Sequence, residues 1–406
     1  AADTAKHISR ITGIPMREEK RLTEQNFGKY ESTARNGEEF KVGEGEPQAI
    51  IRANGGIDMG AVMKSPSLAL GEAYMDKTLE LEKGDLFEIL NMVLAKLEDF
   101  ASDFSGLTKI MKTSTSKKNQ KQEIATHYDI GNEFFELWLD ETMSYSCGYF
   151  KHETDTLYDA QVNKVEHILK KLNLKEGQTL LDIGCGWGYL LIAAAKKYHV
   201  KGVGITLSEE QYKKGQERIK AEGLEGQVEI RLMDYRDLEK SGMTFDRIVS
   251  VGMLEHVSRD NYPLFFKNID KVLNKKGIVL LHYISGRQEH DGDPWIKKYI
   301  FPGGIIPSLR EIIYLIGEYN YYTVDVESLR RHYEKTLLEW SKNYAAKRDT
   351  IDTMFEERFV RMWELYLVAC ASVFHNGICD IHQILFTKGV DNDLPMTRNY
   401  LYQQAE

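Results

Sequence analysis

A glycine-rich segment, Leu181-Asp-Ile-Gly-Cys-Gly-Trp-Gly188, constrains the fold of this chain more than any other feature. An apolar run from Thr179 leads into the segment, and a helical pattern follows from about Tyr189. Glycine is needed where backbone takes a positive φ or approaches a ligand closely. The segment therefore predicts a strand, a tight turn and a helix, with a ligand site beyond the carboxyl end of the strand.

Further apolar runs repeat this alternation of strand and helix. Strands are expected at 179–185, 201–207, 228–234, 247–253 and 277–284, with helices between them. This order predicts an α/β fold whose mostly parallel sheet is covered on both faces. Beyond Pro307 the pattern predicts more helices, including a buried helix at 354–374, and a last strand that begins at His382.

The first part of the chain, residues 1–107, reads as a smaller and mostly helical domain of mixed polarity. Apolar residues recur at helical spacing from Leu68 and from Leu86, and a short strand pair is expected around Phe40 and Ile50. Residues 108–122 contain five lysines and no acid, so they form either a solvated tether or a contact for anionic lipid head groups. Residues 123–406 then form the α/β domain.

Composition limits the partners of the chain. The 406 residues carry a formal net charge of −9, which argues against a nucleic-acid-binding protein. The cysteines lie far apart and lack the spacing of a metal site, so reduced thiols, no metal and a cytoplasmic location are expected for Cys147, Cys185, Cys370 and Cys379. The N-terminus has no apolar signal-peptide core, and no run approaches the ~20 apolar residues of a membrane span. Any membrane contact is therefore expected to be peripheral.

The glycine spacing indicates which cofactor the turn binds. Dinucleotide sites have G-x-G-x-x-G, whereas Gly184, Gly186 and Gly188 follow Asp182 with the spacing G-x-G-x-G. This spacing resembles the first motif of Rossmann-like methyltransferases, which bind S-adenosylmethionine, and it makes Asp182, Gly184 and Gly186 candidates for cofactor binding. A tight turn without a ligand and a nicotinamide site are the alternatives.

Two later segments are candidates for the rest of the cofactor site. Thr206 and Leu207 follow the second strand, where many methyltransferases place an acid that binds the ribose, and Gln211 could supply the missing hydrogen bonds. The segment Asp234-Tyr235-Arg236 follows the third strand, where the adenine edge is expected. Either segment alone could equally be a helix cap or a surface loop.

Several motifs together resemble the cyclopropane fatty acid synthase family. The resemblance is continuous from about residue 123 to 390 and weaker through Gly71-Glu-Ala-Tyr-Met. Its motifs are His127-Tyr-Asp-Ile-Gly-Asn, Tyr145-Ser-Cys-Gly-Tyr, the glycine segment, Ser250-Val-Gly-Met-Leu-Glu-His-Val, Leu281-His-Tyr-Ile, Asp293-Pro-Trp-Ile-Lys-Lys-Tyr-Ile-Phe-Pro-Gly-Gly and the stretch from Tyr333 to Trp340. It implies a Rossmann-like methyltransferase fold with a small N-terminal domain that assists lipid handling.

The resemblance also implies an activity and a set of site residues. The family transfers a methylene group from S-adenosylmethionine to a cis double bond of a phospholipid acyl chain and holds a bicarbonate ion in the site. The matching catalytic positions are Cys147, Glu255, His282, Ile284 and Tyr333. The matching cofactor positions are Tyr145, Ser146, Gly184, Gly186, Thr206, Leu207, Gln211, Asp234, Tyr235 and Arg236. A homodimer associated with the inner face of the membrane is implied as well.

The proposed chemistry accounts for these residue types. Alkene attack on the sulfonium methyl leaves a carbocation, which aromatic faces can stabilise by ~0.5–2 kcal/mol, and a base must then take a proton. Glu255 can accept the bicarbonate O–H, while the amides of Cys147 and Ile284, with His282 and Tyr333, can donate to its oxygens. A methyl-branched or oxygenated acyl product, a small soluble substrate and a non-enzymatic lipid-binding role are the alternatives.

Overall fold

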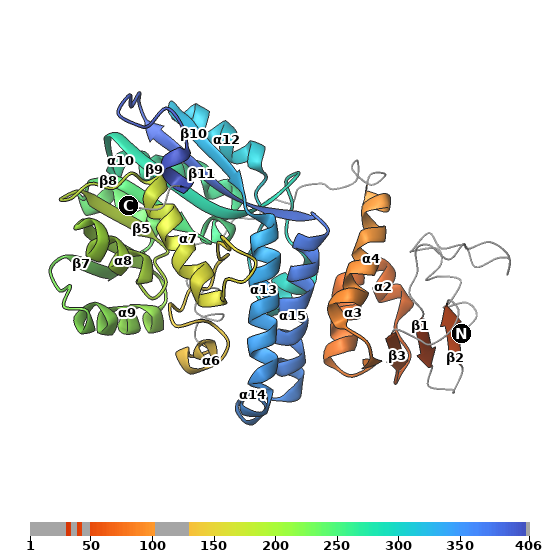
Figure 1. The fold of residues 1–406 in the computed structure, drawn as a ribbon. Coiled ribbons are helices and arrows are strands. Elements are labelled where there is room, and N and C mark those ends of the chain that lie inside the picture. The colour runs from red at the N-terminus through yellow and green to blue at the C-terminus, as the bar shows by residue number, and fades with distance from the viewer. Residues whose placement is uncertain (1–29, 34–38, 43–48, 102–129, 403–406) are drawn as a thin grey trace. The chain divides into compact units, whose positions relative to one another are not determined.

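A seven-stranded sheet with the order β10-β11-β9-β8-β5-β6-β7 organises the larger part of the computed structural model (Figure 1). Five neighbouring strands are parallel, and β9–β11 and β10–β11 are antiparallel pairs. The strands are β5 (Thr179–Ile183), β6 (Lys201–Thr206), β7 (Val228–Leu232), β8 (Phe245–Val251), β9 (Leu273–Gly286), β10 (Tyr321–Ser328) and β11 (Cys379–Lys388). The α/β fold and its mostly parallel sheet are confirmed, whereas β10 was not expected.

The structure describes residues 30–33, 39–42, 49–101 and 130–402. The lysine-rich segment 108–122 and the start of the His127-Tyr-Asp-Ile-Gly-Asn motif lie outside the described residues. Two compact units emerge. The α/β unit contains 130–292, 301–346 and 377–402, and the N-terminal unit contains the described residues up to 101 together with Asp293–Ile300 and Lys347–Asn376.

Helices cover both faces of the large sheet, and neighbouring residues of one strand contribute to different cores because their side chains point to opposite sides. Leu181 and Ile183 pack into a core with residues of α10 (Tyr262–Val272) and α12 (Leu309–Glu318). Leu180 packs into a separate core with residues of α7, α8 and α9. These three helices span Leu157–Lys171, Tyr189–Tyr198 and Glu209–Ala221.

The strand order reverses at β5, because β6 and β7 continue on one side of it and β8 and β9 on the other. A reversal of this kind opens a crevice beyond the carboxyl ends of the strands. The loops after β5, β6 and β8 meet at that edge, and three short 3₁₀ helices follow there at Tyr235–Ser241 (η1), Leu254–His256 (η2) and Arg259–Asn261 (η3). Helices α6 (Asn132–Glu136), α13 (Arg330–Ala346) and α16 (Asn399–Tyr402) complete this unit.

The N-terminal unit combines helices with a four-stranded sheet of order β2-β1-β3-β4. Its strands are Tyr30–Thr33, Glu39–Val42, Ala49–Ala53 and Leu79–Lys83, in chain order. The expected pairing of strands near Phe40 and Ile50 is wrong, because β1 lies between β2 and β3 and pairs with both. The predicted helices from Leu68 and Leu86 are present as parts of α3 (Pro66–Met75) and α4 (Leu86–Ala101).

The N-terminal unit also includes segments that the sequence analysis placed in the α/β domain. They form α11 (Pro294–Tyr299), α14 (Arg348–Met354) and α15 (Glu357–His375), and α2 (Met59–Lys64) completes its helices. The indole of Trp295 lies directly on Gly71, where an added Cβ would be 2.4 Å from Trp295 Cδ1. Trp295 Nε1 also donates to Met75 Sδ at 3.2 Å. The Asp-Pro-Trp-Ile motif therefore belongs to the packing of this unit.

Candidate active site

The glycine turn connects β5 to α8 through backbone that favours glycine. Gly184, Gly186 and Gly188 have φ values of 82°, 54° and 82°, and Gly188 caps the amino end of α8. The amides of Gly184 and Cys185 both donate to the Ile205 carbonyl, at 2.9 and 3.1 Å. The turn is thus fixed against β6. An added Cβ would meet Met253 at Gly184 and Ile230 at Gly188, whereas at Gly186 it would meet no atom within 4 Å.

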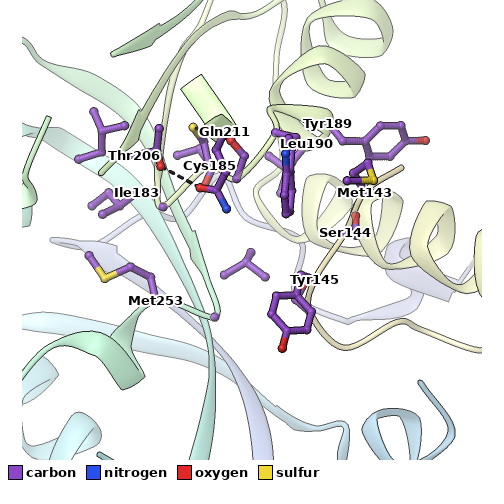
Figure 2. Close-up of a pocket in the computed structure, with 18 of the residues that line it drawn as sticks. Met143, Ser144, Tyr145, Ile183, Cys185, Tyr189, Leu190, Thr206, Gln211 and Met253 are labelled. Atoms are coloured by element: carbon purple, nitrogen blue, oxygen red, sulfur yellow. Dashed lines mark hydrogen bonds between the residues drawn. The ribbon is translucent and has the colours of Figure 1, made fainter. Parts of the chain in front are cut away.

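A cavity lies at this edge and collects most of the predicted cofactor residues (Figure 2). Its lining includes backbone and side chains from the loops after β5, β6 and β8 and from the segment 142–146. The predicted residues in the lining are Tyr145, Ser146, Asp182, Gly184, Gly186, Thr206, Leu207, Gln211 and Tyr235. Residues far apart in the sequence therefore meet at one site.

Thr206 and Gln211 form a buried polar pair in the cavity wall. The Thr206 hydroxyl donates to Gln211 Oε1 at 2.8 Å, as Figure 2 shows, and both residues are buried. Ser208 caps α9 by accepting from the Gln211 amide at 3.2 Å. Thr206 ends β6, where many methyltransferases have an acid, and its hydroxyl fixes the Gln211 side-chain amide beside it. Recognition of the ribose by Gln211 stays a prediction.

The predicted segment after β7 contributes less than expected to the cavity. Tyr235 lines it, but Asp234 and Arg236 do not. The Asp234 carboxylate accepts from Arg236 Nε at 2.9 Å and from Arg236 Nη2 at 2.7 Å. It also accepts from the Arg236 amide at 2.9 Å, at the start of η1. These two side chains bind each other, which explains why they do not face the cavity.

Glu255 is a buried acid on η2, just after β8. Its Oε1 accepts from the Ile284 amide at 2.6 Å, and its Oε2 has no hydrogen-bond partner among the residues that the structure describes. Burial raises the pKa of Glu255 to about 7, although the Ile284 hydrogen bond acts in the opposite direction. The Ile284 amide, which was expected to donate to the bicarbonate ion, donates to the Glu255 carboxylate in this structure.

His282 lies on β9, two residues before Ile284 in the same strand. Gln383 Nε2 lies 3.1 Å from His282 Nδ1, and His282 Nε2 is buried with no partner within the described ranges. Burial, with the nearby charges of Lys164 and Lys171, lowers the pKa of His282 to about 3. The imidazole is consequently neutral at physiological pH, and it can offer one ring nitrogen to a ligand.

Cys147 and Tyr333 are joined through the start of α13. The Leu329 carbonyl accepts from the Tyr333 amide at 3.1 Å and lies 3.9 Å from Cys147 Sγ. The next amide, that of Gly148, donates to Thr336 Oγ1 at 2.9 Å. Burial raises the pKa of the Cys147 thiol far above its usual range. The Cys147 thiol is thus neutral at physiological pH, which makes it a poor nucleophile.

Aromatic rings link the cofactor cavity to Tyr333. Tyr145 lies 5.3 Å from Trp138 and 5.3 Å from Trp340 between ring centroids, and Trp340 lies 6.1 Å from Tyr333. Phe135 stands 5.7 Å from Trp187 of the glycine turn. Electron-rich faces of this kind can stabilise a cation at short range.

Three residues of this site were not predicted from the sequence: Lys164, Gln161 and His256. The first two lie on the buried side of α7, at positions where the helical pattern would place apolar residues. The signal in the sequence was a polar residue at a position of the helical period that is otherwise apolar. His256 lines the cavity next to Glu255, and burial lowers its pKa to about 4.

Comparison with known proteins identifies the family. Residues 115–384 match the family described as mycolic acid cyclopropane synthetase, and residues 25–105 match a domain of unknown function. The chain therefore belongs to the mycolic acid cyclopropane synthetase family. It is an S-adenosylmethionine-dependent enzyme with the Rossmann-like methyltransferase fold that the glycine turn and the sheet order indicated.

Individual relatives cover nearly the whole chain. It is 40% identical to the cyclopropane-fatty-acyl-phospholipid synthase of Escherichia coli, over 87% of this chain and 92% of the relative. It is 39% identical to a probable fatty acid methyltransferase of Pseudomonas putida, over 91% and 95% of the two chains. The crystal structure of mycolic acid cyclopropane synthase CmaA1 complexed with SAH and CTAB matches with a TM-score of 0.62 and 34% identity. That match covers 66% of this chain and 98% of CmaA1.

Proposed function

We propose that this enzyme transfers a methylene group from S-adenosylmethionine to the cis double bond of an unsaturated phospholipid acyl chain and forms a cyclopropane ring. The observation that carries the proposal is the 40% identity to the Escherichia coli synthase over 92% of its length. The buried Glu255 and the neutral His282, both at the carboxyl edge of the sheet that bears the cofactor cavity, support it. Among the described helices, none combines the length and apolar character that crossing a bilayer requires.

The proposed reaction has two steps, methyl transfer to the alkene and closure of the ring. The cavity holds the cofactor so that the alkene carbon can attack its methyl group, which releases S-adenosylhomocysteine and leaves a carbocation. Holding the alkene carbon and the sulfonium methyl group ~3–3.5 Å apart lowers the activation free energy of this transfer. Tyr145 lines the cavity and is the ring of this cluster that is available to the cation, and the buried Trp138 and Trp340 pack against Tyr145. The new methyl group then loses a proton, and its electron pair closes the three-membered ring.

The residues around Glu255 fit a bound bicarbonate ion. Glu255 Oε2 and His282 Nε2 are buried polar atoms without a partner in the described part of the chain, so they can bind a small polar ion. Bicarbonate, when bound, supplies the base for the methyl proton. Glu255 would accept its O–H, and His282, Tyr333 and the Cys147 amide would orient it. The Ile284 amide, which Glu255 occupies, would contribute through that carboxylate.

A methyl-branched product is the second candidate, because the chain is also 39% identical to the Pseudomonas putida protein named as a probable fatty acid methyltransferase. Without a reductant, the methylated carbocation can instead lose a proton from a neighbouring chain carbon, which leaves a methyl-branched chain that keeps a double bond. Both products then gain one CH₂, but only ring closure removes the double bond. Incubation with labelled S-adenosylmethionine and unsaturated phospholipid vesicles, followed by mass measurement before and after catalytic hydrogenation under mild conditions, separates them. A labelled acyl chain that takes up no hydrogen supports the cyclopropane. A labelled chain that takes up one H₂ refutes it, and so does the absence of lipid product.

The role of bicarbonate is tested separately. Wild-type enzyme stripped of carbonate under inert gas should slow and should recover when the ion is added. Glu255→Gln should keep cofactor binding and lose most turnover, and the remaining rate should rise with added bicarbonate. Full activity in carbonate-free buffer, with no bicarbonate response in the variant, would show that a side chain takes the proton.

We also propose peripheral membrane contact, which follows from a phospholipid substrate, and a homodimer, which the family resemblance implies. A phospholipid substrate requires peripheral contact with a bilayer, at the inner face if the enzyme is cytoplasmic. The lysine-rich segment 108–122 and apolar surface of the N-terminal unit are the candidates for that contact. A homodimer is the expected state, and sedimentation velocity with increasing protein concentration measures it.

A further inference from the structure

A buried lysine faces the cofactor cavity and uses little of its hydrogen-bonding capacity. Lys164 of α7 is only 3% exposed and lines the cavity. Its Nζ donates to Ser146 Oγ at 2.9 Å, which is its one hydrogen bond among the described residues. An ammonium group can donate three hydrogen bonds. Two donors of a buried cation are thus left for a ligand in the cavity.

A carboxylate in the same cavity has the complementary property. Asp182, at the carboxyl end of β5, is 3% exposed, lines the cavity and has an Oδ1 without a partner among the residues described. Lys164 and Asp182 interact through their charges but form no ion pair within 4.0 Å in the described structure. The cavity therefore presents a donor-rich cation and an acceptor-rich anion that do not satisfy each other.

This pair is complementary to the zwitterionic end of an α-amino acid. We propose that Lys164 binds the α-carboxylate of the methionine part of S-adenosylmethionine, while Asp182 accepts from its α-ammonium. The inference rests on the cofactor assignment and names a cofactor-binding residue that the sequence motifs did not include. It also explains how a lysine is tolerated in a cavity that binds a cationic sulfonium, since the cofactor supplies the anion that offsets it.

The energetics of burial support the assignment. Burial lowers the pKa of Lys164 to about 8, and the nearby carboxylates of Asp140 and Asp182 act in the opposite direction. Burial also raises the pKa of Asp182 to about 7. Both groups are close to losing their charge without a ligand. An amino-acid ligand that contacts both would hold them in their ionised forms, because a buried charge is stable only when it is paired and hydrogen-bonded.

Lys164 also contacts Ser146, the residue before the predicted catalytic position Cys147. One turn earlier on α7, Gln161 Nε2 donates to the Ser146 carbonyl at 2.9 Å, and Lys164 binds the Ser146 hydroxyl. Cys147 is the next residue, and its thiol also experiences the Lys164 charge. Lys164 would thus hold the carboxylate end of the cofactor and the backbone beside Cys147 in one arrangement.

The experiment compares two ligands in two proteins. Calorimetric titration measures the affinity for S-adenosylhomocysteine and for its analogue without the α-carboxylate. Wild type should bind S-adenosylhomocysteine at least tenfold more tightly than the analogue. In Lys164→Met, the affinity for S-adenosylhomocysteine should fall by tenfold or more, and the ratio of the two affinities should approach one.

The control is Lys170→Met, a substitution of the same type on the same helix at a position outside the cavity lining, and it should keep the wild-type ratio. If Lys164→Met does not fold, as thermal melting will show, Lys164→Gln serves as the second test, because the amide retains a donor for Ser146 without the charge. A folded variant that binds both ligands more weakly by the same factor, or that keeps the wild-type ratio, overturns the proposal. This outcome is distinct from failure of the proposed function, which concerns the lipid product and not cofactor affinity.

Discussion

Glu255→Gln is expected to make the enzyme more stable while it removes most of its turnover. The pKa of Glu255 rises from 4.5 to about 7 when burial takes its carboxylate out of water. A carboxyl group whose pKa is raised in the folded state stabilises the fold below its unfolded pKa, and this contribution is lost as pH rises through the folded pKa. Glu255 therefore lowers the free energy of unfolding progressively between pH 4.5 and about 7.

The magnitude follows from the two pKa values. At ~1.4 kcal/mol for each tenfold change in proton affinity, the ionised carboxylate costs about 3 kcal/mol at pH 8.5. Glutamine has the shape of the protonated acid, and its Oε1 can still accept from the Ile284 amide. The free energy of unfolding of Glu255→Gln should consequently exceed that of wild type by about 3 kcal/mol at pH 8.5 and by less than about 1 kcal/mol at pH 5.

The assay is urea unfolding at both pH values, in carbonate-free buffer without cofactor. Glu327→Gln is a matched control of opposite sign. Burial raises the pKa of Glu327, but the hydrogen bond from His167 and the charge of Lys171 outweigh burial and lower this pKa to about 2. Glu327→Gln should therefore destabilise the protein at pH 8.5. The reasoning is refuted if Glu255→Gln is no more stable than wild type at pH 8.5, or if its advantage is the same at pH 5.

Three further predictions concern glycines and the linker. Gly186→Val should abolish S-adenosylhomocysteine binding in a folded protein, because Gly186 has a φ of 54° that valine rarely adopts; unchanged affinity in calorimetric titration would contradict this. Gly204→Ala should lower the free energy of unfolding by ~1–3 kcal/mol in urea titration, because the new Cβ would lie 2.6 Å from Cys185 Sγ. Adding Cys185→Ala to this variant should recover part of the lost stability, and no recovery would count against the clash. Replacing the five lysines of the lysine-rich segment 108–122 should weaken co-sedimentation of the protein with anionic vesicles at low salt, where charges are least screened. If the variant binds the vesicles as well as wild type does, the segment is only a tether. That variant replaces with Gln the residues Lys109, Lys112, Lys117, Lys118 and Lys121.

Local patterns predicted three strands of the parallel part of the large sheet well. The strands expected at 179–185, 201–207 and 228–234 match β5, β6 and β7 to within two residues at each end. Their apolar runs are buried on both faces, which makes the signal strong. β10 was missed because it lies at the edge of the sheet, mixes polar with apolar residues and depends on pairing with β11, where Tyr321 lies opposite Lys388. Pairing over such a distance leaves no local pattern.

The candidate site was predictable where a motif follows a strand. Asp182, Gly184 and Thr206 lie in the cavity because parallel strands end at the same edge. The engagement of Asp234 by Arg236 could not be predicted, since the two lie only two residues apart in a loop whose conformation decides their contact. Lys164 was overlooked because a lysine in a helix is usually exposed, although its place in the apolar period of α7 was a signal that it is buried.

The N-terminal unit is assembled from three separate stretches of the chain, with α11 and α15 contributed by residues 294–299 and 357–375. Proteins are synthesised from the amino end, and a domain made of one continuous stretch can fold as soon as that stretch emerges. Here the partner of Gly71 is Trp295, and Arg361 Nε donates to the Tyr74 carbonyl at 2.7 Å. During synthesis, α3 can pack against α11 and α15 only after more than two hundred later residues have been made. The unit is therefore completed only after residue 375, and residues 25–105 expressed alone would lack the helices against which α3 packs.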